Sequence, residues 1–322
     1  MTHLIRVGVL RGGPSSEYDV SLKTGASVLK HLPEDRYLPV DVFITKDGRW
    51  VVSGVEMLPS GIADHVDVVW NALHGAYGED GKVQRILESI GIPYTGSRVV
   101  PSALGMHKEH AKRQFSRAGL RTPRGIVVER DADLSEAAFD IFLAWDLPLV
   151  VKPVSGGSSV ATTIAHDLAT LYDGLLDAAE YGDILVEEML LGREATCAVV
   201  DLGQGKHAAL FPIEIIPPEE NDFFDYDAKY SGKSREVCPG DFSLADIAEI
   251  RKASITAHRA LGLRHYSRSD FIVTPEGPYI LETNTLPGLT EESLLPKALK
   301  ASNVDLPSFL DHVLGLTLEE AR

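Results

Sequence analysis

The sequence has few cysteines, no basic clusters and no long apolar runs. Its two cysteines, Cys197 and Cys238, match no metal-binding spacing. No apolar run reaches the roughly 18 residues that suggest a membrane span, and no hydrophobic targeting segment precedes the first predicted strand. The net charge is −16 without a basic run, which argues against nucleic-acid or anionic-membrane surfaces because both require clustered lysine and arginine. We therefore expect a soluble cytoplasmic protein that binds neither nucleic acid nor membrane.

The length and the order of patterns predict an α/β protein of two or three domains. The chain has 322 residues and 44% hydrophobic content, which is ample for several cores. A β-branched run at 5–10 leads through a Gly-rich turn into an amphipathic segment at 20–32, and further strands are predicted at 40–44 and 66–73. Strand, turn and helix in this order are typical of a Rossmann-like parallel-sheet domain.

Two loops of this first region carry polar side chains that allow two interpretations. Ser15 or Ser16 could cap the following helix, with Glu17 in its first turn. Alternatively, Glu17 lies at the carboxyl end of a strand, where α/β sheets bind ligands, and presents its carboxylate to a substrate amine. The Gly-rich loop at 74–81 is either a binding loop or a turn in which Asp80 caps a helix at 83–90.

The middle of the chain predicts a second αβ unit with a glycine-rich tip. We expect a helix at 106–118 with Lys108 in its first turn, then strands at 125–129 and 149–154. Lys152 lies on the last of these strands, immediately before a Gly/Ser tip at 155–159. Such a tip is either a plain hairpin turn or a phosphate cradle, because glycine permits close backbone approach and free N–H groups bind anions.

The region after residue 190 predicts antiparallel strands and a long aperiodic segment. Strands are expected at 193–201 and 207–216, and a helix capped by Ser243 at 244–261. The intervening 217–242 shows no periodicity. A loop of that length inside a domain is either disordered or a lid, and its aromatic residues favour a lid that closes over a ligand.

A predicted hairpin near the C-terminus gathers the most informative polar residues. Pairing about Glu276 places Asp270 opposite Glu282 and Arg268 opposite Asn284, all on one face. Two close carboxylates repel each other strongly without a counter-ion. Oxygen ligands of this kind suit Mg²⁺, which usually carries substrate phosphates as well. A solvated hairpin face is the alternative.

Taken together, these segments resemble the D-alanine–D-alanine ligases of the ATP-grasp superfamily. The resemblance runs essentially end to end, and the order and spacing of the motifs make it specific. The motifs are those at 12–21, 74–81, 94–96, 152–153, 157–160, 227–230, 268–270 and 282–288.

The resemblance implies three domains: an N-terminal α/β substrate-binding domain (1–98), a central lid domain (99–188) and a C-terminal mixed-sheet catalytic domain (189–322). It implies ATP between the last two, two Mg²⁺ ions for which Mn²⁺ can substitute, and D-alanine as substrate. It also implies a cytoplasmic homodimer that supplies the peptidoglycan precursor D-alanyl-D-alanine.

The resemblance also assigns roles on the nucleotide side. Lys108, Lys152 and Lys229 would contact the ATP phosphates. Glu187 and Leu190 would offer backbone groups to the adenine, and Glu194 would hold the ribose. The metal ligands would be Asp270, Glu282 and Asn284.

The amino-acid side is assigned in the same way. Glu17 would receive the ammonium of the first D-alanine, in a hydrogen-bonded trio with Ser158 and Tyr230. Arg268 and the Gly288 N–H would face the developing oxyanion. The remaining substrate-binding residues would be His74, Ser293 and Leu294.

Some positions depart from the family pattern. Ser155 and Gly156 stand where relatives often carry a charged pair, Ala161 stands where they tend to have glycine, and Glu188 replaces a lysine beside the adenine. Tyr230 favours an amine acceptor, since D-lactate-using relatives tend to have phenylalanine there. Alternatives are a same-fold ligase with another acceptor (D-serine, D-lactate or an L-amino acid) and a non-catalytic nucleotide-binding relative. An NAD-dependent oxidoreductase is disfavoured because the G-x-G-x-x-G spacing is missing.

Overall fold

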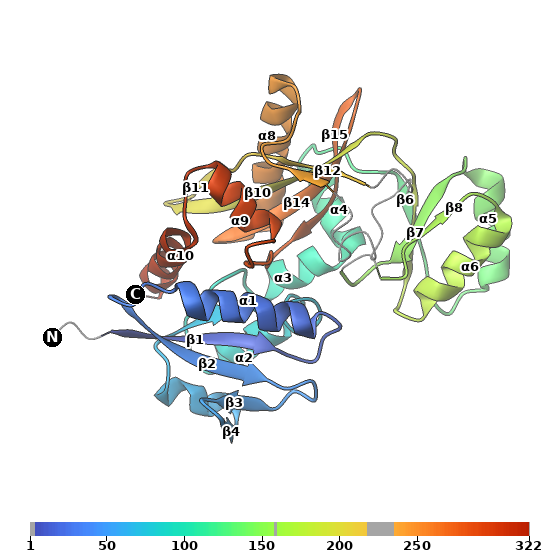
Figure 1. The fold of residues 1–322 in the computed structure, drawn as a ribbon. Coiled ribbons are helices and arrows are strands. Elements are labelled where there is room, and N and C mark those ends of the chain that lie inside the picture. Colours follow the sequence, from blue (N-terminus) through green and yellow to red (C-terminus); the bar gives the residue numbers. More distant parts are fainter. Residues whose placement is uncertain (1–3, 158–159, 218–234, 322) are drawn as a thin grey trace.

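The computed structural model describes residues 4–157, 160–217 and 235–321 and contains three sheets. In Figure 1 the N-terminal sheet lies at the bottom, the C-terminal strands lie above it, and the central sheet stands to the right. Helices and strands are mixed along the chain, which confirms the predicted α/β class.

The first sheet has the order β4-β3-β2-β1-β5 and a parallel centre. β1 (Ile5–Gly12) pairs in parallel with both β2 (Tyr37–Ile44) and β5 (Val68–Asn71). β3 (Trp50–Val52) and β4 (Val55–Met57) add an antiparallel edge. The accompanying helices are α1 (Tyr18–His31), the 3-10 helix η1 (Pro59–Asp64) and α2 (Lys82–Ser89).

The central sheet has the order β6-β9-β7-β8, and all of its pairings are antiparallel. Its strands are β6 (Gly125–Val128), β7 (Leu149–Pro153), β8 (Thr163–Ala165) and β9 (Ile184–Glu188). Two helices, α5 (Leu134–Ala144) and α6 (Leu168–Ala179), pack on this sheet through an apolar core of their own (Figure 1).

The third sheet has the order β13-β12-β10-β14-β15, with β11 also paired to β10. A mixed sheet was expected, but every described pairing in this sheet is antiparallel. The strands are β10 (Arg193–Gly203), β11 (Lys206–Ala209), β12 (Ile213–Ile216), β13 (Arg235–Val237), β14 (Tyr266–Thr274) and β15 (Gly277–Asn284). The helices that accompany it are α3 (Val99–Met106), α4 (Lys108–Arg117), α8 (Leu244–Ala260), α9 (Leu294–Ala301) and α10 (Leu306–Glu320).

Shared cores join the beginning and the end of the chain. Trp70 of β5 stacks on Tyr266 of β14, with 6.1 Å between ring centroids, and both contact Phe309 of α10 edge-on. A second core packs Phe115 of α4 with Phe271 of β14. In the sequence, α3 and α4 lie between the strands of the first sheet and those of the central sheet, but they pack on the third sheet. The boundaries at 98 and 188 stay predictions.

The hairpin register at the predicted site is confirmed, and the structure adds a bulge. Arg268 pairs with Asn284 and Asp270 with Glu282, as predicted. Nearer the turn the register changes, because Phe271 pairs with Ile280 and leaves Leu281 extra. The tight turn from Thr274 to Gly277 shifts the register by one residue, and the bulge at Leu281 shifts it back. Asp270 and Glu282 therefore pair as predicted.

Three local predictions are corrected. Neither serine caps α1: its N-cap is Glu17, and Ser15 Oγ accepts a hydrogen bond from the Glu17 N–H at 3.1 Å. The helix expected at 106–118 is α4 and begins only at Lys108; Met106 ends the separate helix α3, because His107 between them is extended and bridges to Ser155. The strand expected at 207–216 is two strands separated by a break that contains Pro212, which lacks an N–H for the ladder.

Two further predictions are refined. Asp80 Oδ1 accepts the Lys82 N–H at 3.0 Å, but the N-cap of α2 is Gly81. The segment at 217–242, expected to be aperiodic, contains β13, and its residues 218–234 lie outside the described part of the chain. Within the described ranges, no helix is long and apolar enough to cross a membrane.

Candidate active site

Two adjoining cavities lie between the three sheets. One, of about 830 Å³, is lined by β7 and β9 of the central sheet and by β14 and β15 of the third. The other, of about 790 Å³, is lined by the loops of the first sheet and by the segment after β15. Both are lined by Glu17, Lys108, Asp270 and Glu282. Lys108 and the hairpin carboxylates therefore lie where the two cavities meet.

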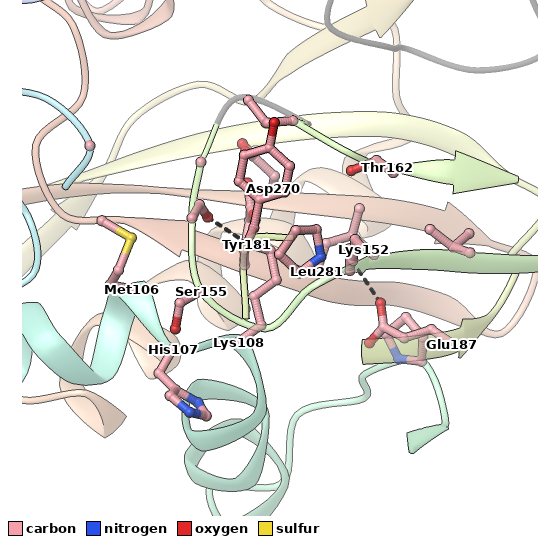
Figure 2. A pocket seen from close by; sticks show the side chains of 18 of the residues that line it. Met106, His107, Lys108, Lys152, Ser155, Thr162, Tyr181, Glu187, Asp270 and Leu281 are labelled. Atoms are coloured by element: carbon pink, nitrogen blue, oxygen red, sulfur yellow. Dashed lines mark hydrogen bonds and ion pairs between the residues drawn. The ribbon is translucent and has the colours of Figure 1, made fainter. Parts of the chain in front are cut away.

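In the first cavity a buried carboxylate is held between two lysines. Glu187 of β9 is 2% exposed; its Oε2 lies 2.7 Å from Lys152 Nζ and its Oε1 2.5 Å from Lys112 Nζ. Figure 2 shows Lys152 and Glu187 facing each other in this pocket, near Lys108. Burial alone would raise the pKa of Glu187, but the charges of Lys152 and Lys112 outweigh it and hold the pKa below its ordinary value. This carboxylate is a fixed anion that orients two cations.

Lys112 is a residue that sequence reasoning missed. It lies one turn after Lys108 on α4, and Lys112 Nζ also donates to Thr122 Oγ1 at 2.9 Å. Burial lowers its pKa to about 8, against the opposing charge of Glu187. The helical spacing from Lys108 was the only sequence signal.

Lys108 connects the glycine-rich tip to the hairpin carboxylates. Its Nζ donates to the carbonyl oxygen of Gly156 at 2.6 Å and lies 3.7 Å from Glu282 Oε2. One side chain thus contacts both the central and the third sheet. A phosphate placed here would meet Lys108 and Lys152 together.

The hairpin face holds the predicted cluster. Arg268 binds Asp270 through two hydrogen bonds of 3.0 and 2.9 Å, and Thr196 Oγ1 of β10 donates to Asp270 Oδ1 at 2.6 Å. Burial would lower the pKa of Arg268, but Asp270 outweighs it and the pKa is raised. Asn284 Oδ1 accepts the Leu286 N–H at 2.9 Å. The ligand atoms offered by Asp270, Glu282 and Asn284 are all oxygens, which fits Mg²⁺.

The second cavity carries Glu17 and a buried histidine. A Cβ added to Gly75 would meet Glu17 Oε2 at 2.6 Å, so the loop backbone approaches the carboxylate as only glycine allows. His74 Nε2 lies 2.8 Å from Thr24 Oγ1, and burial lowers the pKa of His74.

Glu79, in the same loop, is a buried acid. Its Oε1 accepts the Gly75 N–H at 2.8 Å, and burial together with the nearby Glu17 raises its pKa to about 8.

The turn after β15 closes the far end of the second cavity. Ser293 Oγ lies 2.8 Å from Thr290 Oγ1 and accepts the Thr290 N–H at 3.2 Å. A Cβ on Gly288 would meet Ser293 Oγ at 2.8 Å, so glycine here lets the backbone approach the serine hydroxyl closely. Leu294 begins α9 immediately afterwards. These residues line the same cavity as Arg268 and His74.

The structure brings most of the predicted site residues together. The first cavity includes Lys108, Lys152, Glu187, Leu190 and Glu194. The second includes Glu17, His74, Arg268, Asp270, Glu282, Asn284, Gly288, Ser293 and Leu294. Three predicted residues, Ser158, Lys229 and Tyr230, lie outside the described residues.

The departure at Glu188 has a partner in the structure. Glu188 Oε1 accepts the Arg124 N–H at 2.9 Å, and Arg124 Nε lies 2.7 Å from Glu188 Oε2. Arg124 also lies over the ring of Trp145, 5.6 Å from its centroid. The carboxylate is thus tied to β6, and Glu188 still lines the first cavity.

A lid-like antiparallel sheet that faces a second antiparallel sheet across a lysine- and carboxylate-lined cavity defines an ATP-grasp enzyme. Sequence models of the D-ala D-ala ligase N-terminus match residues 6–60 and 56–97, and the D-ala D-ala ligase C-terminus matches 115–315. The chain belongs to the D-alanine–D-alanine ligase family and is a ligase.

Individual relatives agree with this membership. The D-alanine–D-alanine ligase of Desulfotalea psychrophila is 39% identical over 99% of this chain and 96% of its own length. The VanG D-Ala:D-Ser ligase of Enterococcus faecalis superposes with a TM-score of 0.86 at 29% identity, over 98% of this chain and 100% of that one. The Bacillus anthracis D-alanine–D-alanine ligase complexed with ATP superposes with a TM-score of 0.81 at 33% identity, over 99% of each chain.

Proposed function

We propose that this protein uses ATP to join two D-alanine molecules into D-alanyl-D-alanine through an acyl phosphate, supplying the peptidoglycan precursor. One observation carries the proposal: the two cavities meet at Lys108, Asp270 and Glu282. A nucleotide in the first and amino acids in the second would bring a γ-phosphate and a carboxylate together there. The ATP-bound relative from Bacillus anthracis supports the choice of nucleotide.

In the first half-reaction, the carboxylate of the first D-alanine attacks the γ-phosphorus and ADP leaves. Lys108 and Lys152 stabilise the charge on the transferring group, assisted by Lys229, while Glu187 and Leu190 bind the adenine and Glu194 the ribose. Fixed positive charge is the main contribution that a protein makes to phosphoryl transfer. Asp270, Glu282 and Asn284 would hold Mg²⁺, which would neutralise phosphate charge when bound.

In the second half-reaction, the amine of the second D-alanine attacks the carbonyl carbon of the acyl phosphate; the new peptide bond forms as the C–O bond to phosphate breaks, and inorganic phosphate leaves with the amine proton. Glu17, with Ser158 and Tyr230, orients the ammonium of the first D-alanine, and Ser293 and Leu294 hold the carboxylate of the second. Arg268 and the Gly288 N–H stabilise the tetrahedral oxyanion. His74, with its lowered pKa, lines this cavity as a neutral ring.

The first test is phosphate release from ATP with D-alanine and, separately, with L-alanine, with the product identified by mass. Release with D-alanine only, together with a D-alanyl-D-alanine mass, is the expected result. ATP binding without release in either case would contradict the proposal and favour either another pair of amino-acid substrates or a non-catalytic nucleotide-binding protein.

The carboxylate assignment has a matched control on the same hairpin. Glu282→Gln should abolish turnover, whereas Glu276→Gln in the turn should leave it unchanged because Glu276 lines neither cavity. Turnover near the wild-type rate in Glu282→Gln would remove Glu282 from the metal site. Titration of Mg²⁺, then Mn²⁺, in both variants measures the ion requirement.

A second candidate function is favoured by one comparison. The VanG relative is a D-Ala:D-Ser ligase, so the acceptor is open to the same test with D-serine and D-lactate. Tyr230→Phe should raise the use of D-lactate relative to D-alanine, and an unchanged ratio would count against this assignment of Tyr230.

The family resemblance also supports a cytoplasmic homodimer. Sedimentation of the full chain at several concentrations measures the assembly, and a monomer at micromolar concentration would contradict it. Fractionation of cells that express the tagged chain locates it.

A further inference from the structure

Two histidine side chains, those of His207 and His258, face the side chain of Asp201 near the end of β10. Asp201 and His207 are register partners in the β10–β11 hairpin, and His258 comes from the last turn of α8. None of the three lines either active-site cavity. This cluster is independent of the proposed function.

Two imidazole nitrogens converge on a single carboxylate oxygen. Asp201 Oδ1 lies 2.5 Å from His207 Nδ1 and 3.1 Å from His258 Nε2. These three atoms lie within 4.8 Å of one another. One oxygen facing two ring nitrogens requires positive charge or protons between them. Two imidazoles and one carboxylate are also a common ligand set for a zinc-like ion.

The groups behind the three ligand atoms are arranged as outer-shell partners. His258 Nδ1 lies 2.8 Å from the buried Ser267 Oγ, and if it donates there, Nε2 presents a lone pair toward Asp201. Asp201 Oδ2 accepts the His265 N–H at 2.6 Å, which fixes the carboxylate. Metal-binding histidines and carboxylates are usually oriented by such second hydrogen bonds.

The cluster also has a side open to solvent. The side chain of His258 is fully buried, whereas those of His207 and Asp201 are 12% and 15% exposed. Ligands held at about 2.0–2.2 Å from one ion stand farther apart than the 2.5 Å between His207 Nδ1 and Asp201 Oδ1, so ion binding requires His207 to move outward. His207 lies beside a register shift between Asp201 and Gly203, where rotation of the side chain can supply that movement.

We propose that Asp201, His207 and His258 bind a divalent transition-metal ion of the zinc class, with water as the fourth ligand. The ion ties the β10–β11 hairpin to α8. It also reinforces the contact with α10, where His312 Nε2 lies 2.6 Å from the Asp201 carbonyl oxygen. The role is structural, and the ion takes no part in ligation.

The test is calorimetric titration of Zn²⁺ into the EDTA-treated full-length protein, with excess Mg²⁺ present to occupy carboxylate sites. The wild type should bind one more equivalent than His207→Ala, or bind it at least tenfold more tightly. The matched control is His110→Ala, which disrupts a second group of suitable ligands among the described residues, His107, Glu109 and His110. His110→Ala should retain the equivalent that His207→Ala loses.

Two further readouts do not depend on activity. Co²⁺ in place of Zn²⁺ should give a visible ligand-field spectrum that His207→Ala lacks. Zn²⁺ should raise the Tm of the wild type but not that of His207→Ala, because an ion that binds only the folded state stabilises it. Equal stoichiometry and affinity in both proteins, or no binding by the wild type, would overturn the proposal and leave a hydrogen-bonded cluster only.

Discussion

Two buried glutamates, one in each cavity, have opposite electrostatic environments. Glu187 lies within 2.7 Å of two lysine ammonium groups, and their charges lower its pKa. Glu79 accepts the Gly75 N–H, and its pKa is raised to about 8 by burial and by the negative charge of Glu17. Burial is therefore common to both residues, and the neighbouring charges decide the ionisation state.

The difference corresponds to what each cavity is proposed to bind. The phosphate-binding side needs positive charge that is already fixed, and Glu187 holds Lys112 and Lys152 in place without becoming neutral. The amino-acid side already has the Glu17 carboxylate, and a second nearby anion would raise the cost of burying both. A largely protonated Glu79 avoids that cost at neutral pH.

The comparison is tested most strongly by Glu187→Gln. This variant leaves two buried lysines without their carboxylate and should cost about 3–5 kcal/mol of unfolding free energy. Urea denaturation measures the loss. The neighbouring Glu188→Gln is a matched control, since its partner Arg124 is 76% exposed and such pairs contribute about 0–1 kcal/mol. Similar losses in both variants would show that the buried lysines do not depend on Glu187.

A smaller effect is expected from Lys112→Met, which keeps the apolar stem and removes the ammonium group. Glu187 then retains Lys152 as its remaining lysine partner. A double-mutant cycle with Glu187→Gln should give a coupling of about 0.5–3 kcal/mol, as for residues that share one ion-pair network. Additive losses of unfolding free energy would place Lys112 outside the network.

The sequence predicted the part of the site that lies on regular structure. Alternation along two strands was enough to place Arg268 with Asp270 and Glu282 opposite Asp270. It could not reveal the bulge at Leu281, because the tight turn and the bulge shift the register by compensating amounts.

Features that depend on contacts distant in sequence were missed. The break between α3 and α4 follows from the bridge between His107 and Ser155, which join different parts of the chain. The ion pair between Lys112 and Glu187 arises only when α4 packs beside β9. Helical periodicity and residue type contain no information on either contact.

The last prediction concerns pH and the Glu79 side of the comparison. A carboxyl whose pKa is raised from 4.5 to about 8 on folding stabilises the fold below pH 4.5. That contribution is lost as the pH rises to about 8, because over this range the folded state binds more protons than the unfolded state. Glu79→Gln removes the titration while keeping the shape and hydrogen-bonding capacity of the neutral acid.

Between about pH 5 and about pH 8, the wild type should therefore lose unfolding free energy relative to Glu79→Gln. The expected loss exceeds the roughly 1.4 kcal/mol that one pKa unit represents. Urea denaturation at several pH values measures this shift. Asp80→Asn is the adjacent control: the hydrogen bond from Lys82 lowers the pKa of Asp80 despite its partial burial, so its titration lies below this range. A pH-independent difference between the wild type and Glu79→Gln would mean that Glu79 is ionised in the folded protein, and the two buried glutamates would then be alike.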